Sequence, residues 1–439
     1  MHAQKLHQVL RAFHLLLWCS LHSFSQPRPP NITPPPPTPS SICGFHSTGC
    51  RPPPASSLFV PQHLQLLSLL TTAKDAAPVM WPATFPLCFM LCGVWISASE
   101  VQAALPPNLI MTQMVQMFQD FMRQFNKTYE SQEETHRRFK VFMRNLEVSH
   151  VLQVSELGTA QYGITRFSDL TEHEFAKMYG MSLPSPAPPV KQLSYPNLGN
   201  IANKSISQSC DWRKAGAVSA VKDQGPDCRS CWAFATVSNI EALWNIHQHV
   251  PRNLSVQEVI DCAYKKTGCQ GGFVWDGLLA VFKNRGLSSS VLYPYVGRNQ
   301  PCQEHRRKKV TPIYGYEVLP RDEKYIAGIV ASQGPVTALF NMKVLQNYKK
   351  GILRRPSQDC RPDHLDHVGV IVGFNEVKSR RGSWTGPYWI IQNSWGEHWG
   401  EQGYFRLHRG TNTCGIAMYA VTATVKDSER KKPVLCPAA

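Results

Sequence analysis

The sequence predicts an α+β protein in which a helical N-terminal segment precedes a helix-rich lobe and then a strand-rich lobe. Three patterns support this fold class. Six residues between 134 and 153 recur at spacings of three and four, and helical spacing also runs from Trp232 to His247. Alternating apolar runs bounded by Gly and Pro dominate after about residue 310. A helical lobe that faces a sheet lobe leaves a cleft between them.

The first 106 residues show no pattern of a packed domain. Many of the 34 prolines crowd into residues 1–79, so we expect this part to be disordered, or to be an over-extended gene prediction upstream of a start at Met80. Residues 80–106 form the expected signal peptide region, because the apolar run 85–96 is too short for a stable membrane span. A second apolar stretch at residues 13–21 is the other candidate entry signal.

Residues 107–183 are rich in long charged and aromatic side chains and predict two helices. The first helix places six residues on one face: Glu134, Arg138, Phe142, Asn145, Ser149 and Gln153. Glu134 and Arg138 stand in the favourable order for an i,i+4 ion pair. The following residues 163–170 alternate like a short strand, and Thr171 with Glu174 indicates a capped second helix.

The remaining chain divides into a linker and two lobes. Residues 184–209 contain Pro184, Pro186, Pro188 and Pro189 at their start and predict an exposed linker, which proteases cut readily. From Cys210 onward, helices are expected at 232–247 and after Ser255, where Glu258 completes a capping box. Strands are expected at 368–373, 388–391 and 404–407.

Charge and cysteine usage restrict the partners and the compartment. The formal charge is +16, but Lys and Arg are scattered apart from two short runs and no nucleic-acid motif is present, so we expect no nucleic acid partner. Nine of the 14 cysteines lie between Cys210 and Cys436. One reactive thiol leaves eight, enough for four disulfides in an oxidising compartment. We therefore expect a monomer in the lumen of the secretory pathway, in the lysosome or endoplasmic reticulum, or secreted.

Three sequons fit the same compartment. Asn126, Asn203 and Asn253 each begin an Asn-X-Ser/Thr acceptor for a glycan.

Three separated segments carry candidate chemistry: Cys228-Arg-Ser-Cys231, Asp366-His367 and Asn393-Ser-Trp395. A CxxC pair elsewhere indicates a redox centre or half a zinc site. Here no second CxxC lies at zinc-finger spacing and no βαβ pattern surrounds the pair, which argues against both. Taken singly, each of these residues is more often structural than catalytic.

In combination the segments resemble the papain family of cysteine proteases, and the resemblance covers nearly everything after residue 107. The helical face from Glu134 to Gln153 resembles the family's inhibitory propeptide helix. Gly163, Thr165, Phe167 and Asp169 resemble its second propeptide motif. The resemblance implies a two-lobe papain-like fold with a helical left lobe and a β-barrel-like right lobe at 210–439, preceded by an inhibitory propeptide at 107–183.

The resemblance also implies a role for each candidate residue. Cys231 would be the nucleophile, His367 its base and Asn393 the group that orients the imidazole, while Trp395 shields their hydrogen bond. Gln224 and the backbone N–H of Cys231 would form the oxyanion hole. A thiolate–imidazolium pair is expected, because Cys231 begins a helix and His367 supplies a cation. No cofactor or metal is expected; the partners would be peptide substrates, the protein's own propeptide and cystatin-type inhibitors.

Two further sets of residues follow from the resemblance. The substrate-binding residues, whose S2 pocket should prefer small aliphatic side chains, are Gly271, Gly272, Phe273, Val274, Leu339, Val368 and Tyr419. The implied disulfides are Cys228–Cys269, Cys262–Cys302 and Cys360–Cys414, which leaves Cys210 and Cys436 as a fourth pair.

One segment departs from the family pattern. Gln224 and Cys231 are seven positions apart, where most members have six, and Arg229 stands where a Gly is usual. This departure supports a second hypothesis, a papain-fold protein that binds peptides but hydrolyses them poorly because the longer loop displaces Gln224. A disulfide oxidoreductase is a remote third.

Overall fold

The structure, a computed structural model, describes residues 107–181, 208–263, 267–303, 308–377, 384–432 and 434–439. The expected regions 1–79 and 80–106, nearly all of the linker 184–209, and Asn203 lie outside these residues. The described N-terminal part contains four regular elements: α3 (Pro107–Gln124), α4 (Gln132–Val154), β1 (Gln161–Tyr162) and α5 (Glu172–Tyr179).

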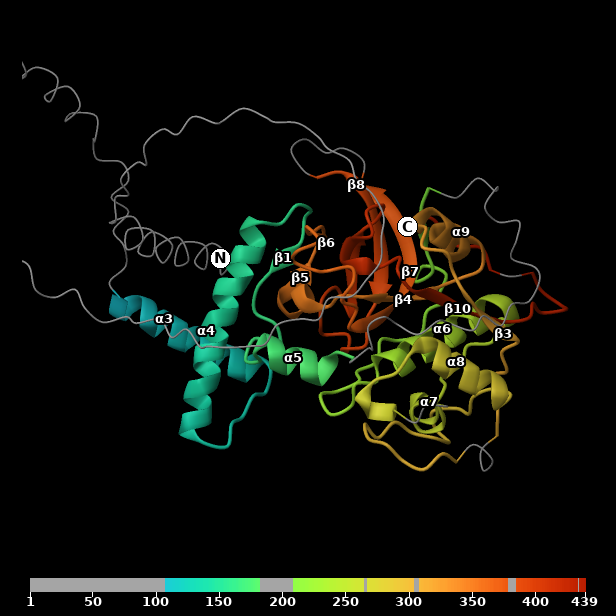
Figure 1. Ribbon diagram of the computed structural model, residues 1–439, viewed down its shortest axis with the longest axis horizontal. Coiled ribbons are helices and arrows are strands. Elements are labelled where there is room, and N and C mark those ends of the chain that lie inside the picture. The colour runs from blue at the N-terminus through green and yellow to red at the C-terminus, as the bar shows by residue number, and fades with distance from the viewer. Residues whose placement is uncertain (1–106, 182–207, 264–266, 304–307, 378–383, 433) are drawn as a thin grey trace, which may run out of the picture. The chain divides into compact units, whose positions relative to one another are not determined.

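The two long N-terminal helices cross and are held by aromatic side chains (Figure 1). Phe118 and Phe121 of α3 lie 5.3 and 5.1 Å from Phe142 of α4, measured between ring centroids. All three rings are buried, so their apolar area stabilises the crossing. This arrangement explains why Phe142 belongs to the helical face identified in the sequence.

The polar members of the same face bind the segment that follows. The expected ion pair between Glu134 and Arg138 is present at 2.7 Å, and Arg138 also reaches Glu174 at 3.0 Å. Asn145 donates two hydrogen bonds to the carbonyl groups of Ser168 and Leu170, both at 2.8 Å. The N-terminus of α5 carries the complete capping box predicted for Thr171 and Glu174.

The prediction of a strand at 163–170 is wrong, because this segment is a turn. The Ser168 N–H donates to the Thr165 carbonyl at 3.1 Å, and the Thr165 N–H donates to the Ser168 hydroxyl at 2.9 Å. Such local bonds compete with strand pairing. Among the described residues, the strand just before this turn is β1, which pairs antiparallel with β5 (Tyr348–Lys350).

The helical lobe is built around α6. All but three of the 18 residues of α6 are buried, which makes it the central helix of the protein. Ser255 accepts the Glu258 N–H as expected, but the Glu258 carboxylate binds the Ser288 N–H instead of completing the capping box. The helices of this lobe are α6 (Cys231–Gln248), α7 (Val256–Cys262) and α8 (Val274–Lys283), with a 3₁₀ turn at Gly268–Gln270.

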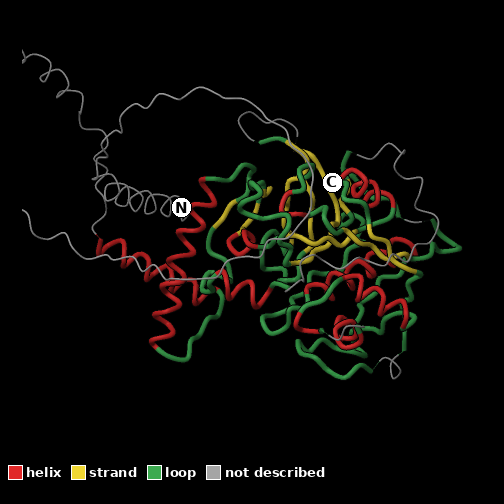
Figure 2. Tube along the Cα trace, in the orientation of Figure 1, coloured by secondary structure: helices red, strands yellow, loops and turns green. Residues whose placement is uncertain are grey.

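The second lobe is a mainly antiparallel sheet, gathered on one side of the helical lobe (Figure 2). Its strands follow the order β3-β10-β4-β7-β8-β9-β6, with β2 paired to β7. The sheet does not close into a barrel in the described residues, since β3 and β6 end the path. The elements are β2 (Cys210–Asp211), β3 (Gly315–Val318), α9 (Glu323–Ser332), β4 (Val336–Phe340), β5 (Tyr348–Lys350), β6 (Ile352–Leu353), β7 (His367–Val377), β8 (Gly386–Gln392), β9 (Tyr404–His408) and β10 (Ala420–Thr424).

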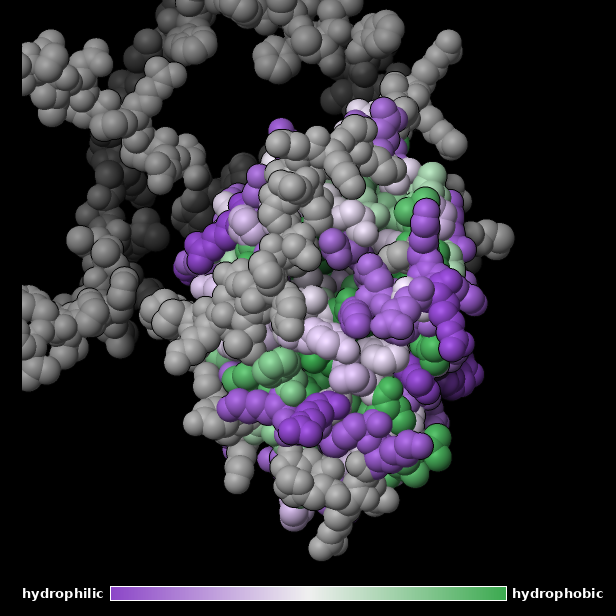
Figure 3. All heavy atoms as spheres, turned by 90° about the vertical axis from the view of Figure 1, so that its right-hand side faces the viewer, coloured by the Kyte–Doolittle hydropathy of each residue, from purple (hydrophilic) through white to green (hydrophobic). Residues whose placement is uncertain are grey.

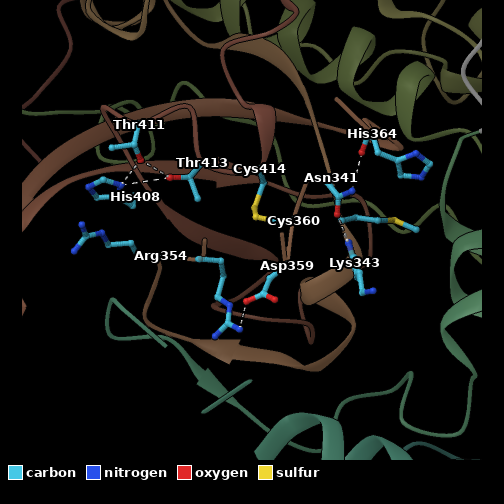
Figure 4. The surroundings of a disulfide bond; sticks show 12 residues. Asn341, Lys343, Arg354, Asp359, Cys360, His364, His408, Thr411, Thr413 and Cys414 are labelled. Carbon is cyan, nitrogen blue, oxygen red and sulfur yellow. Dashed lines mark hydrogen bonds and ion pairs between the residues drawn. A yellow bond between two sulfur atoms is a disulfide. The ribbon is translucent and has the colours of Figure 1, made fainter. Parts of the chain in front are cut away.

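Four disulfides join the pairs named above. Cys360–Cys414 ties the loop before β7 to the 3₁₀ turn Thr413–Gly415, and Figure 4 shows Asn341 beside it. The Asn341 side chain donates to the His364 carbonyl at 2.7 Å and its backbone N–H donates to the Cys414 carbonyl at 2.9 Å. These bonds fix the chain that leads into His367.

The C-terminal segment lies against the end of α6. The N–H groups of Ser428 and Val434 donate to carbonyl groups of α6, and Cys436 is bonded to Cys210. The face of the molecule in Figure 3 is largely hydrophilic with small hydrophobic areas between, as expected of a surface exposed to water.

Candidate active site

Cys231 is the first residue of the buried central helix. It is the one described cysteine without a disulfide partner. Because it occupies the first helical position of α6, its backbone N–H has no acceptor within the helix. The adjacent disulfide Cys228–Cys269 and the hydrogen bond from the Arg229 N–H to the Cys269 carbonyl (3.1 Å) anchor the chain just before it.

His367 and Asn393 come from neighbouring strands. His367 begins β7, and Asn393 directly follows β8. The His367 Nε2 lies 2.8 Å from the Asn393 Oδ1, which also accepts the Ser394 N–H at 2.9 Å. An amide oxygen can only accept, so Nε2 carries the proton and Nδ1 of the neutral ring is the free base. Within the described ranges the Nδ1 atom has no hydrogen-bond partner, which leaves it a free acceptor.

Trp395 covers the histidine. Its ring centroid lies 4.7 Å from that of His367, and Trp399 packs edge-on against Trp395 with centroids 4.7 Å apart. Both tryptophans and His367 are buried. The hydrogen bond between His367 and Asn393 is therefore isolated from water.

Gln224 is buried between Ser394 and the chain just before Cys231 despite the longer loop. Its side chain is 1% exposed, and its Oε1 accepts the Ser394 hydroxyl at 2.8 Å. Its Nε2 donates to the Cys228 carbonyl at 3.3 Å, so one of its two N–H groups remains for another acceptor. Pro226 and Asp227 are exposed, which shows that the extra length bulges into solvent.

Burial favours the neutral forms of the thiol and the imidazole, unlike the thiolate–imidazolium pair expected from the sequence. Burial raises the pKa of the Cys231 thiol to about 12, although the backbone N–H groups of Val368 and Trp232 oppose the shift. Burial also lowers the pKa of His367 to about 4, against the hydrogen bond to Asn393 and the nearby Tyr179 backbone. Complete removal of both side chains from water disfavours their charged forms.

The expected substrate-binding residues gather beside this site. Leu339 and Val368 are paired between β4 and β7, and the Leu339 N–H donates to the Tyr419 carbonyl at 3.1 Å. Phe273 and Val274 belong to the same buried cluster as Leu339, Val368 and Cys231. A Cβ on Gly272 would lie 2.8 Å from the Trp232 ring, so the Gly271-Gly272 pair allows the chain to pass close to the helix that carries Cys231.

One aromatic contribution to this region was missed by the sequence analysis. Trp275 stacks on Phe273 with ring centroids 4.3 Å apart and lies 6.0 Å from Tyr419, and Arg321 lies over the Tyr419 ring. Phe273, Trp275 and Tyr419 are thus linked by ring contacts. Trp275 lies only two positions after Phe273, a predicted substrate-binding residue, and this closeness in the sequence could have identified it.

The described residues also bear on glycan acceptors, metal sites and membrane spans. Asn126 and Asn253 are exposed, as a glycan acceptor must be. No group of three or more His, Cys, Asp or Glu side chains in the described ranges is arranged to hold a metal ion. None of the described helices combines the length and apolar character needed to cross a membrane.

Comparison with known proteins agrees with this geometry. Residues 206–424 match the papain family cysteine proteases, and residues 118–175 match the cathepsin propeptide inhibitor domain (I29). Cathepsin W of Mus musculus is 40% identical over 365 residues, covering 80% of this chain and 97% of that protein. Cathepsin W of Felis catus is 42% identical over 342 residues, covering 74% of this chain and 90% of that protein.

A solved structure shows the same architecture. The recombinant stem bromelain precursor aligns with a TM-score of 0.63 at 30% identity, covering 72% of this chain and all of that one. The chain belongs to the papain family of cysteine proteases. It is a cysteine endopeptidase precursor that carries its own inhibitory propeptide. Its similarity to cathepsin W is consistent with the segments 271–276, 404–410 and 412–416 and with the basic tail before Cys436, which resemble that protein in the sequence.

The propeptide of this papain-family precursor docks on Trp395. The rings of Phe167, Phe175 and Tyr179 lie 5.2, 5.4 and 6.0 Å from the Trp395 ring. The Met181 N–H then donates to the carbonyl of Asp366, the residue before His367, at 2.6 Å. The propeptide therefore covers the His367 side of the site with a tightly packed aromatic cluster.

An ion pair extends this contact to the segment just before Gln224. Arg166 of the propeptide lies 2.5 Å from Asp223, which precedes Gln224, and donates to the Trp395 carbonyl at 3.2 Å. Both charged side chains are about one-third exposed, so the pair contributes at most about 1 kcal/mol. Sequence analysis missed Arg166 because nothing in its local pattern indicates a partner 57 positions away.

Replacing Arg166 with Ala is expected to accelerate conversion of the precursor about threefold, because a contact worth up to about 1 kcal/mol is lost from the docked propeptide. Conversion is followed by gel electrophoresis over time. Arg123→Ala is the matched control, since Arg123 pairs only with Asp120 inside α3. If both variant precursors convert at the parent rate, Arg166 does not hold the propeptide.

Proposed function

We propose that the processed protein hydrolyses peptide bonds with Cys231 as nucleophile, His367 as general base and Asn393 as the residue that orients the imidazole. The observation that carries this proposal is the bond between His367 Nε2 and Asn393 Oδ1. That bond leaves Nδ1 without a partner among the described residues, and the N–H of Val368, the next residue in the chain, is directed at the Cys231 thiol. The arrangement has the order nucleophile, base and orienting group required for covalent catalysis.

The proposed reaction begins when the propeptide leaves and water enters the cleft. The Cys231 proton moves to His367 Nδ1, and the positive end of α6 stabilises the thiolate. The thiolate attacks the peptide carbonyl carbon, and His367 returns the proton to the amine as the C–N bond breaks. His367 then takes a proton from water, whose oxygen attacks the thioester carbon; the C–S bond breaks, the carboxylic acid leaves, and His367 returns its proton to the Cys231 sulfur.

Gln224 and the Cys231 N–H are proposed to stabilise the oxyanion. One N–H of the Gln224 amide donates to the Cys228 carbonyl, which leaves the second N–H for the oxyanion. The N–H of Cys231 has no acceptor within α6, because Cys231 is the first residue of that helix. Ser394 fixes the amide rotamer by donating to Gln224 Oε1. Trp395 is proposed to exclude water from the hydrogen bond between His367 and Asn393.

The substrate and the setting are further parts of this proposal. The S2 pocket would be formed by Phe273, Val274, Leu339, Val368 and Tyr419, and its apolar lining favours a small aliphatic P2 side chain over Arg. Processing would cut the linker 184–209 and release a monomeric peptidase, 210–439, that cystatin-type inhibitors block. The four disulfides and the exposed Asn126 and Asn253 support a location in the secretory lumen, in lysosomes or outside the cell.

The experiment uses the processed protein and a thiol-directed epoxide. Mass spectrometry should find one adduct, on Cys231, and labelled protein should no longer cleave a peptide with Val or Leu at P2. A matched peptide with Arg at P2 should be cleaved at least tenfold more slowly. Labelling of any other residue, or full activity after labelling, would contradict the proposal.

The poorly hydrolysing alternative required a displaced Gln224. The buried Gln224 and the outward bulge of Pro226 and Asp227 favour an active oxyanion hole instead. We therefore expect that deleting Asp227 and changing Arg229→Gly alters kcat less than threefold. A rise of tenfold or more in the repaired variant would restore the alternative.

A further inference from the structure

Tyr295 contacts both ends of the oxyanion loop, and the proposed mechanism assigns it no role. Its hydroxyl donates to the Gln224 carbonyl at 2.6 Å and lies 3.1 Å from the Ser230 hydroxyl. Gln224 begins the loop and Ser230 ends it, directly before Cys231. One side-chain oxygen is therefore bound to the two residues that flank the exposed Pro226-Asp227 bulge.

The protons of these groups can be placed without conflict. A carbonyl oxygen accepts only, so the single Tyr295 proton points at Gln224. The Ser230 proton is then free to point at the Tyr295 oxygen or at the Cys228 carbonyl, which is 3.2 Å away. Burial raises the pKa of Tyr295, so the hydroxyl keeps its proton at neutral pH.

The ring of Tyr295 and the loop that carries it are held by contacts with α6 and α7. It packs edge-on against Phe234 of α6, with centroids 5.0 Å apart. The next residue, Val296, donates its N–H to Gln257 Oε1 on α7 at 3.0 Å. The disulfide Cys262–Cys302 joins the same loop to the end of α7. The hydroxyl therefore has a fixed position relative to both α6 and α7.

We infer that Tyr295 is a positioning residue for the oxyanion hole, which holds the loop from Gln224 to Ser230 so that the Gln224 amide and the Cys231 N–H face one point. The inference rests on the proposed function, because it assigns the oxyanion role to those two donors. The loop is one residue longer than is usual in the family and is exposed at its middle, so ordering it costs more conformational entropy. Hydrogen bonds between Tyr295 and both ends of the loop help to offset this cost. In this role Tyr295 acts through the loop and not on the reacting atoms.

The test compares Tyr295→Phe, which removes only the hydroxyl, with the parent processed enzyme. We expect kcat on an aliphatic-P2 peptide to fall about tenfold, less than the roughly hundredfold or greater loss typical when an oxyanion donor is removed. KM should stay within twofold. The rate of Cys231 labelling by an epoxide should also stay within twofold, because that reaction forms no tetrahedral oxyanion.

Tyr293→Phe is the matched control. Tyr293 lies two residues earlier and donates its hydroxyl to Asp261 Oδ2 at 2.9 Å, away from the oxyanion loop. Its removal should lower Tm while kcat stays within twofold of the parent. An equal loss of kcat in both variants would show that the effect is general loosening of the lobe, and would overturn the inference.

A double-mutant cycle with Gln224→Ala decides whether Tyr295 acts through Gln224. In the Gln224→Ala background, Tyr295→Phe should lower kcat by less than twofold further, because the donor it positions is gone. A full additional tenfold loss, or an unchanged kcat in the single variant, would overturn the inference. A parent enzyme that neither cleaves peptides nor labels at Cys231 would instead overturn the proposed function.

Discussion

Replacing Cys231 with Ala is expected to abolish peptide hydrolysis, by roughly 10⁴-fold or more, while the precursor still folds. The loss should be this large because no other side chain can form the acyl-enzyme. Folding should persist because the thiol belongs to no disulfide and its removal from the buried first turn of α6 takes away only one sulfur atom. Activity on an aliphatic-P2 peptide and thermal unfolding of the precursor measure the two effects.

Cys228→Ala is the control for this prediction, since Cys228 stands three positions earlier and bridges to Cys269. It should destabilise the helical lobe by about 2–5 kcal/mol and leave Cys269 as a free thiol. The processed protein should keep an epoxide-reactive Cys231 when assayed below its lowered Tm. Equal residual activity in the two variants would mean that Cys231 is not the nucleophile.

Removing the propeptide is expected to raise the reactivity of the Cys231 thiol by a factor on the order of 10³ or more at pH 7. In the precursor the pKa of this thiol is about 12, so its thiolate is a minute fraction at neutral pH. After processing, solvent and a protonatable His367 permit the low thiol pKa that a helix N-terminus and a cation produce. Iodoacetamide, which is small, measures the rate in both forms, and precursor carrying Cys231→Ala gives the background.

The pH dependence of the same reaction distinguishes the two states. Because the thiolate fraction rises tenfold per pH unit below the pKa, labelling of the precursor should keep rising up to the highest pH at which it stays folded. Labelling of the processed enzyme should already be at a plateau near neutral pH. A precursor that shows the same early plateau would mean that the ion pair exists beneath the propeptide, contrary to the neutral pair described above.

Much of the fold could be predicted because its signals are local. The α4 face from Glu134 to Gln153 repeats every three or four residues, and the side chains of Thr171 and Ser255 each cap a backbone N–H three positions away. The strands β7, β8 and β9 lie where apolar alternation placed them. The wrong strand at 163–170 has the same origin, since an alternating pattern does not reveal that Ser168 and Thr165 bond to one another.

The chemistry of the site was accessible from the sequence for a different reason. Cys231, His367 and Asn393 stand in segments whose combination and order resemble one family, so their types and spacing were sufficient to name them. Their mutual geometry was not accessible: 136 residues separate the thiol from the imidazole along the chain. The position of Gln224 was also not accessible, because it depended on whether Pro226 and Asp227 would be exposed to solvent or packed against the protein.

The sequence by itself determined the family, the helical and strand-rich halves, the candidate catalytic residues and the candidate disulfide partners. Only the tertiary structure decided the charge state of the site, the ion pair of Arg166 with Asp223 and the anchoring of the oxyanion loop by Tyr295. The physical reason is that helix caps and periodicity arise between near neighbours in the chain. Burial, which keeps Cys231 and His367 neutral in the precursor, arises from distant segments that meet only when the chain has folded.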